Sequence, residues 1–143
     1  LLGSTVQVNG KALKALPTRD AVLPAIMLLS AADKVLISTL VDALPQRYTH
    51  SDRIQNFATE KSRAIIEQGK KDPATLLKQL GFDNVEIKNV DETDGLRIIL
   101  IDGLIVHLRP SGNAPELRCY AETDNYIQAN ERVVKTLKNI QKI

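Results

Sequence analysis

A short stretch of the chain combines the groups that bind a phosphate. Arg109 offers a planar guanidinium that matches two phosphate oxygens, and Ser111 offers a hydroxyl donor. Gly112 lets successive backbone N–H groups converge on an anion, while Asn113 tolerates left-handed backbone angles and adds an amide donor. The segment from Arg109 to Ala114 is therefore a candidate phosphate-binding loop. An ordinary hairpin loop with a solvated arginine remains the alternative.

Three side chains beside the loop could support it. His107 could add a donor to the phosphate, or its ring could pack against a neighbour. Arg118 is expected to pair with Glu116 or Glu122 rather than contact a ligand. Glu116 lies close to the proposed anion, so we expect it to orient Arg109 or Arg118.

Two strands are predicted to hold the loop. Apolar residues alternate with other residues over 104–109 and again over 116–121, which is the period of a strand. His107 and Arg109 should then share one face. Two prolines, a glycine and an asparagine separate the two runs, and all of them favour a tight loop.

Other reactive side chains are few. The single cysteine, Cys119, lies in a predicted strand and is expected to be a small buried side chain. His50 has no metal-binding or catalytic partner nearby in sequence, and the Arg19–Asp20 pair is expected to be an ion pair at a helix start. We find no Ser-His-Asp set, carboxylate cluster or Cys/His spacing, so we predict no catalytic residue and no metal ligand in this chain.

The loop and its flanks resemble a known family. Arg109–Glu116 resembles the phosphate-binding loop in the fourth domain of the α-D-phosphohexomutases, which usually reads Arg-x-Ser-Gly/Asn-Thr-Glu/Thr-Pro. Asp102–Val106 and Leu117–Glu122 resemble the strands on either side. Asn113 and Ala114 depart from the usual pattern, which predicts fewer side-chain contacts to the phosphate.

The resemblance implies an enzyme as the whole protein, a phosphotransferase-type isomerase. The family includes phosphomannomutases, phosphoglucomutases and phosphoglucosamine mutases, and the Gly-Asn-Ala-Pro-Glu version of the loop is most similar to the phosphomannomutases. Such enzymes interconvert hexose 6-phosphates and hexose 1-phosphates through a phosphoserine and a hexose 1,6-bisphosphate, with Mg²⁺. The resemblance places the serine, the metal ligands and the sugar-reading loop in the first three domains.

We therefore expect a C-terminal portion that is inactive alone and whose partners are a hexose phosphate and the missing domains 1–3. The other two mutase types are alternatives. From the residues alone, a non-catalytic phosphate-binding or interaction module is a further alternative.

Composition narrows the class of protein. The 143 residues are 43% hydrophobic and 25% charged, the balance of a globular protein. A net charge of +2 and the scarcity of aromatic side chains argue against nucleic acid as a partner, and the small charge argues against an anionic membrane. No apolar run approaches the roughly 20 residues of a membrane span.

The start of the chain bears on its origin. Leu1 is not a methionine and no signal-peptide pattern follows it, so we expect a piece of a longer protein. One cysteine is compatible with the reducing cytoplasm, which is the expected location.

The chain is expected to form two regions joined by a hinge. Residues 1–47 should hold a hairpin around Asn9–Gly10 and two helices, over 20–30 and 33–44, and they resemble the remnant of an α/β third mutase domain. Residues 48–53, polar and preceded by a proline, are predicted to be the linker. Residues 54–143 should form the fourth domain.

That domain is predicted to be α+β, with about four antiparallel strands and helices on one face. The expected strands cover 85–90, 96–101, 104–109 and 116–121, with a further short strand at 54–57. The expected helices cover 59–68, stopped by Gly69; 73–80, capped by Asp72; and about 124–141, capped by Thr123 or Asp124.

Overall fold

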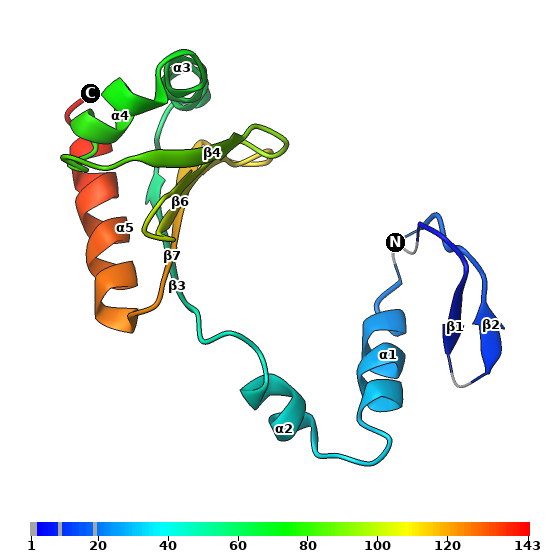
Figure 1. Cartoon of the computed structure of the whole chain (residues 1–143). Coiled ribbons are helices and arrows are strands. Elements are labelled where there is room, and N and C mark those ends of the chain that lie inside the picture. Colours follow the sequence, from blue (N-terminus) through cyan, green and yellow to red (C-terminus); the bar gives the residue numbers. More distant parts are fainter. Residues whose placement is uncertain (1–2, 9, 19) are drawn as a thin grey trace. The chain divides into compact units, whose positions relative to one another are not determined.

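The computed structural model describes residues 3–8, 10–18 and 20–143 and divides the chain between Gln46 and Arg47 into two compact units. Figure 1 shows the elements of both units. Asn9 and Arg19 lie outside the described residues, and so does the expected Arg19–Asp20 ion pair.

The first unit contains a small hairpin and two helices. Strands β1 (Val6–Val8) and β2 (Lys11–Leu13) pair antiparallel, as predicted, and the helices are α1 (Leu23–Ala31) and α2 (Ile37–Asp42). Helix α2 is shorter at both ends than predicted. None of the described residues between 3 and 46 is buried, and apolar side chains of both helices are exposed.

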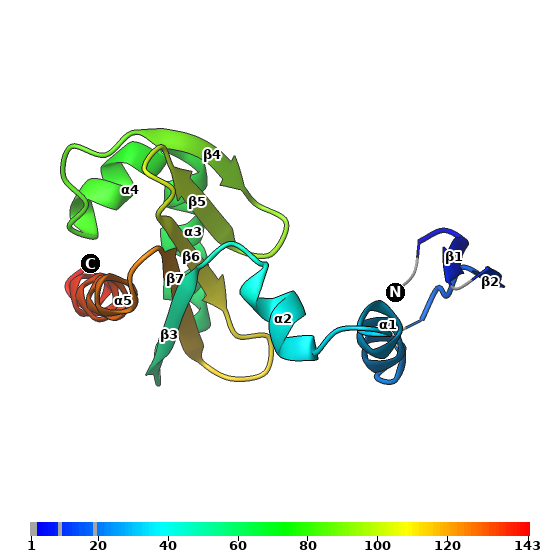
Figure 2. The ribbon, with the colours of Figure 1, turned by 60° about the horizontal axis from the view of Figure 1, so that its bottom comes forward.

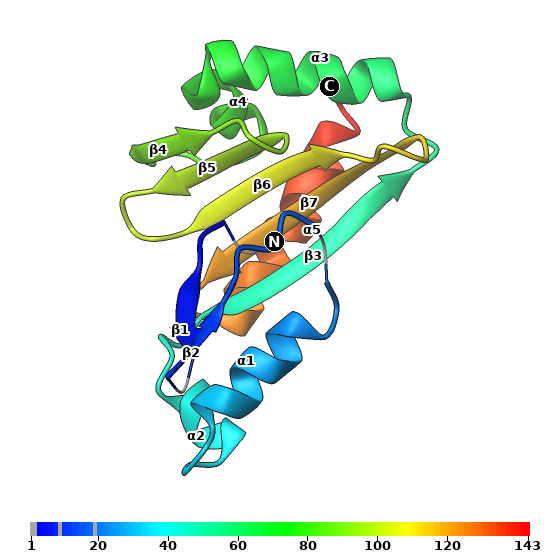
Figure 3. The same cartoon turned by 90° about the vertical axis from the view of Figure 1, so that its right-hand side faces the viewer.

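The second unit is built on one antiparallel sheet. Its strands are β3 (Tyr48–Gln55), β4 (Ile87–Asp91), β5 (Leu96–Leu100), β6 (Ile105–Pro110) and β7 (Glu116–Thr123). Their order across the sheet is β3-β7-β6-β5-β4, and each neighbouring pair is antiparallel. Figure 3 shows the five strands side by side, with α5 behind them. The α+β class is confirmed, with one more strand than expected.

The additional strand is β3. Residues 48–53, predicted to be a linker, belong to it, and they pair with residues 118–123 of β7. The short strand predicted over 54–57 overlaps β3 only at Ile54 and Gln55. β3 is an edge strand whose side chains are mostly exposed, with Ile54 alone buried, so it lacks the apolar alternation that marks a strand in sequence.

Helices α3 (Thr59–Lys71), α4 (Pro73–Gln79) and α5 (Tyr126–Ile140) complete the unit. Helix α5 packs on β3 and β7, while α3 packs on β5, β6 and β7. Figure 2 shows these helices on one side of the sheet. The buried side chains of β5, β6 and β7 alternate with more exposed ones, so one face carries the core and the opposite face is open.

Two helix details differ from the sequence prediction. Gly69 does not end α3 but lies buried within it. A Cβ there would collide with the side chains of Leu76 and Leu96. Helix α5 is capped by Asn125, whose side chain accepts the N–H of Gln128 at 3.1 Å, rather than by Thr123 or Asp124.

Other predictions for the helices are confirmed. The Asp72 side chain accepts the N–H of Thr75 at 3.0 Å and caps α4, which begins with Pro73. Hydrogen bonds from the backbone N–H and the hydroxyl of Thr75 hold the pKa of Asp72 below its usual range. Among the described residues, no helix is both long enough and apolar enough to span a membrane.

Candidate phosphate-binding site

The candidate loop connects β6 and β7, two interior strands of the sheet. The N–H of Ser111 donates to the carbonyl of Glu116 at 2.9 Å, and the N–H of Glu116 donates to the carbonyl of Ala114 at 2.8 Å. The carbonyl of Pro115 accepts the N–H of the buried Phe57 at 2.8 Å, which ties the loop to the start of α3. The loop is therefore closed by its own backbone and anchored to the core.

Donors remain available within this closed loop. The N–H groups of Gly112 and Ala114 have no acceptor in the part of the chain that the structure describes. The hydroxyl oxygen of Ser111 accepts the N–H of Asn113 at 3.4 Å, so its own proton is free to donate outward. A Cβ at Gly112 would meet no atom within 4 Å, which leaves the backbone there open to a ligand.

The loop does not adopt the left-handed backbone conformation that its glycine and asparagine would tolerate. Neither Gly112 nor Asn113 has a positive φ, so neither occupies the left-handed region in this structure. The positive-φ glycine nearest to Arg109 in space is Gly95, in the turn between β4 and β5.

Arg109 is oriented by a residue that the sequence prediction missed. Its Nε lies 2.9 Å from Oδ1 of Asp94. Both side chains are exposed, and Asp94 lies between the strands predicted over 85–90 and 96–101. A hairpin folded about Asp102–Gly103 pairs Leu96 with Leu108, so residues just before Leu96 must lie beside Arg109. That pairing is the signal that could have identified Asp94.

His107 lies on the same face as Arg109, as predicted, but its ring is engaged. Its Nε2 lies 2.6 Å from the carbonyl oxygen of Asp94, which requires Nε2 to carry the proton. The ring also stacks on Tyr120, with centroids 5.4 Å apart and planes 30° apart. In this structure, His107 therefore supports the site through Asp94 and Tyr120.

A row of arginines crosses the open face of the sheet. Arg53, Arg118 and Arg109 occupy directly opposed positions on β3, β7 and β6. Oε2 of Glu116, which is mostly buried, lies 3.6 Å from Arg53 and 3.7 Å from Arg118. Like charges at opposed positions repel one another, so this row favours an anion. Glu116 pairs with Arg118, as expected, and not with Arg109, while Glu122 pairs with Arg47.

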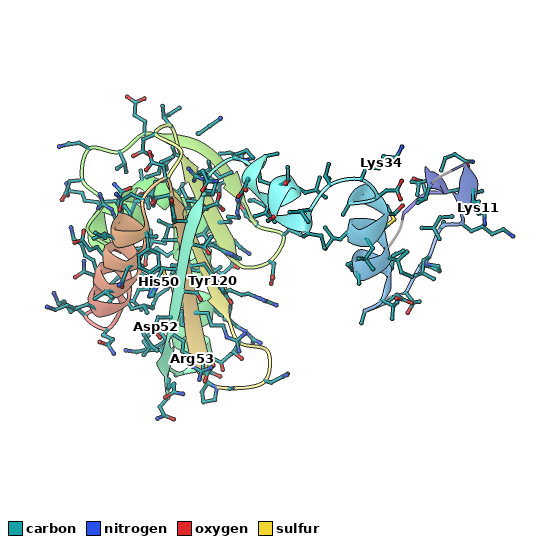
Figure 4. All side chains as sticks on the ribbon, turned by 90° about the horizontal axis from the view of Figure 1, so that it is seen from below. Lys11, Lys34, His50, Asp52, Arg53 and Tyr120 are labelled. Carbon is teal, nitrogen blue, oxygen red and sulfur yellow. The ribbon has the colours of Figure 1, made fainter. Side chains whose placement is uncertain are left out.

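A shallow hollow of about 350 Å³ adjoins this row. It is lined by Ser51, Asp52, Arg53, Arg118 and Tyr120. Figure 4 shows Asp52 and Arg53 on β3 with Tyr120 on the neighbouring strand. Arg118 and Arg53 thus extend the positive charge of Arg109 across the sheet, next to the hydroxyl groups of Ser51 and Tyr120.

Two reactive side chains outside the loop are Cys119 and His50. Cys119 is fully buried, and burial raises the pKa of its thiol to about 12. His50 contacts Tyr126 edge-on, with ring centroids 6.5 Å apart. Among the described residues, no three His, Cys, Asp or Glu side chains gather as a metal-binding group would require.

Comparison with known proteins assigns the family. The model of the phosphoglucomutase/phosphomannomutase C-terminal domain matches residues 56–139. A phosphomannomutase of Salmonella muenchen is 50% identical over 141 residues, which cover 99% of this chain and 30% of that protein. A phosphomannomutase of Sinorhizobium fredii (strain NBRC 101917 / NGR234) is 39% identical over 130 residues, covering 87% of this chain and 27% of that protein.

The chain thus spans about 30% of the length of these relatives. The matched segment contains the sheet from β4 to β7, the three helices that cover it and the candidate loop. The resemblance noted in the sequence is therefore confirmed: the chain belongs to the phosphoglucomutase/phosphomannomutase family, and residues 56–139 match its C-terminal domain.

Proposed function

We propose that this chain is the substrate-phosphate-binding C-terminal portion of a phosphomannomutase, which interconverts mannose 6-phosphate and mannose 1-phosphate. The observation that carries the proposal is the donor set of the loop. The free end of the Arg109 guanidinium, the Ser111 hydroxyl and the unpaired N–H groups of Gly112 and Ala114 lie in one connection. The printed names of both relatives support the choice of reaction.

The loop would bind the phosphate that is not reacting. A guanidinium fork, a hydroxyl and backbone donors recognise a phosphate with little regard for the rest of the sugar. Such a loop suits a reaction in which the sugar turns round and presents its other phosphate. Binding energy gained at the remote phosphate can then orient the reacting end.

The bond-making groups would be supplied by other parts of the parent enzyme. The resemblance implies a phosphoserine, Mg²⁺ and a hexose 1,6-bisphosphate intermediate. The described residues provide no group of carboxylates that fits Mg²⁺. The portion alone should be inactive, and it would act with domains 1–3 of the same chain.

The first unit fits the same proposal. Both of its helices expose apolar side chains, including Leu29, Ile37 and Val41. In the parent enzyme these helices would complete the third domain and pack against the rest of it. The proposal also assumes a cytoplasmic enzyme, which rests on the single cysteine of the sequence.

Arg109→Ala tests the proposed role of the loop. Removing a charge-assisted contact should lower kcat/KM of the full-length parent by about 30- to 1,000-fold, corresponding to about 2–4 kcal/mol. The assay compares mannose 1-phosphate, glucose 1-phosphate and glucosamine 1-phosphate, and the substrate with the highest kcat/KM identifies the mutase type.

Arg63→Ala is the matched control, because Arg63 is an exposed arginine of α3 outside the site. It should leave kcat/KM unchanged. An unchanged kcat/KM in Arg109→Ala would contradict the role of the loop. No turnover of any of the three sugars, by folded parent enzyme with Mg²⁺ and a bisphosphate primer, would instead favour a non-catalytic binding module.

A further inference from the structure

The turn between β4 and β5 contacts two side chains of β6 through a single residue. The carboxylate of Asp94 lies 2.9 Å from Nε of Arg109, and its backbone carbonyl accepts from Nε2 of His107 at 2.6 Å. Since His107 and Arg109 are two positions apart on one strand, they share the open face of the sheet. One residue of a neighbouring turn therefore fixes two consecutive side chains on that face.

The turn itself is held firmly in place. The side chain of Asp91 accepts the N–H of Thr93 at 2.9 Å, and this contact holds the pKa of Asp91 below its usual range. Gly95 has a φ of 92° and lies against the backbone of β6, so that a Cβ there would collide with the carbonyl of Leu108. Leu96, the next residue, is fully buried. Asp94 is thus presented from a turn with little freedom to move.

Asp94 contacts Nε of Arg109, and this leaves the other guanidinium nitrogens free of it. Asp94 accepts from Nε, and Arg109 has no other ion-pair partner among the described residues. The two terminal nitrogens remain available, and together they form the edge of the guanidinium that can bind two oxygens of one phosphate. A long flexible side chain is therefore held at one end while its phosphate-binding end stays free.

We propose that Asp94 is a positioning residue for the substrate phosphate. It holds the Arg109 guanidinium so that its terminal nitrogens face the anion bound by the 109–114 loop, and it does not contact the sugar phosphate itself. The inference rests on the proposed function of that loop and adds a residue from another hairpin to it. The group recognised is the non-reacting phosphate of a hexose phosphate.

A surface ion pair alone would predict a different outcome. Pairs between exposed side chains contribute little to stability, so a purely structural Asp94 would affect neither folding nor substrate affinity appreciably. A positioning role predicts a change in affinity that depends on Arg109. The test must therefore separate stability from binding and must include Arg109.

The experiment uses Asp94→Asn in the full-length parent, because asparagine keeps the shape and the backbone carbonyl of the turn. KM for the hexose phosphate should rise about five- to tenfold, in the range of couplings between contacting charged side chains, while kcat changes less than KM. Asp94→Glu, which restores the charge, should recover part of the loss. The unfolding temperature of each variant should stay close to that of the wild type.

A double variant supplies the decisive comparison. If Asp94 acts through Arg109, then Asp94→Asn should add little to the effect of Arg109→Ala. Glu92→Gln, a charge change two residues away in the same turn, should leave KM unchanged. Additive effects, or a wild-type KM in Asp94→Asn, would overturn the inference while leaving the proposed function intact. An unaffected Arg109→Ala would instead overturn the proposed function.

Discussion

The side chains of the loop show how far residue types alone predict a site. A guanidinium, a hydroxyl and a glycine in one short connection indicate phosphate from their chemistry, whatever the fold around them. The partners of Arg109 could not be identified in this way, because Asp94 is distant in sequence and reaches Arg109 only through the pairing of β5 with β6. Glu116, the carboxylate nearest in sequence, contacts Arg53 and Arg118 instead.

Cys119 provides a test at the scale of one residue. Burial raises the pKa of its thiol to about 12, so the reactive thiolate is only about one part in ten thousand at pH 8. We expect a thiol reagent such as DTNB to react with the native chain very slowly at pH 8, and to react rapidly once urea unfolds it. Because the chain has one cysteine, the absorbance change reports this site alone.

The urea-unfolded chain is the control for that measurement, since it exposes the same thiol without its surroundings. A native chain that reacts as fast as the unfolded one would show that Cys119 is accessible, which would contradict its burial.

At the scale of elements, strands that bury one face in the core are predicted well from the sequence, and the exposed edge strand is predicted poorly. Strands β5, β6 and β7 alternate buried and more exposed side chains, so their period of two is visible in the sequence. β3 buries only Ile54, and its pairing with β7 depends on backbone hydrogen bonds that no side-chain pattern records. Tyr126 and Ile127 show the converse, because they are apolar residues of α5 that are nevertheless exposed.

Gly69 gives the prediction at this scale. Alanine normally stabilises a helix relative to glycine by up to about 1 kcal/mol. At Gly69, however, the added methyl would collide with Leu76 and Leu96, both fully buried. We therefore expect Gly69→Ala to destabilise the chain by about 1–3 kcal/mol, the usual cost of overpacking a core. Urea unfolding followed by circular dichroism measures this free energy.

Arg63→Ala, on the exposed side of the same helix, serves as the reference and should change stability by less than about 0.5 kcal/mol. A Gly69→Ala variant that is more stable than the wild type would show that Leu76 and Leu96 can move away from α3 with no loss of folding free energy. That result would contradict the close packing described here.

At the scale of the whole molecule, the two units differ in how many apolar side chains each one buries. The second unit has a continuous core of side chains from its sheet and helices, including Leu76, Leu108, Leu117 and Ile140. In the first unit, none of the described residues is buried, although α1 is strongly apolar. Apolar burial is the main favourable term in folding, so stability should be concentrated after Gln46.

Hydrogen exchange of the 143-residue chain tests this difference. Amides of α1 and α2 should exchange close to the rate of an unfolded chain, whereas those of β5, β6 and β7 should exchange only on global unfolding. Mass spectrometry of peptides from the two units after the same exchange times gives the comparison. Equal protection of α1 and α5 would contradict the expected concentration of stability.

Arg47 anchors the start of the second unit. Its guanidinium donates to Glu122 at 2.9 Å and to the carbonyl of Gly103 at 2.6 Å, so the second unit holds the chain from its first residue. On the other side, the N–H of Leu44 donates to the carbonyl of Val41 at 3.0 Å and continues the end of α2. Pro45 and Gln46 lie between these two fixed points.

The stretch between these fixed points, Pro45 and Gln46, is therefore very short. Each residue contributes two soft backbone torsions, and Pro45 has lost one of them because its ring fixes φ. The backbone between these two points therefore has only a few soft torsions. Breaking the Arg47 contacts would extend this stretch and add soft torsions to it, with the loss of contacts inside the second unit.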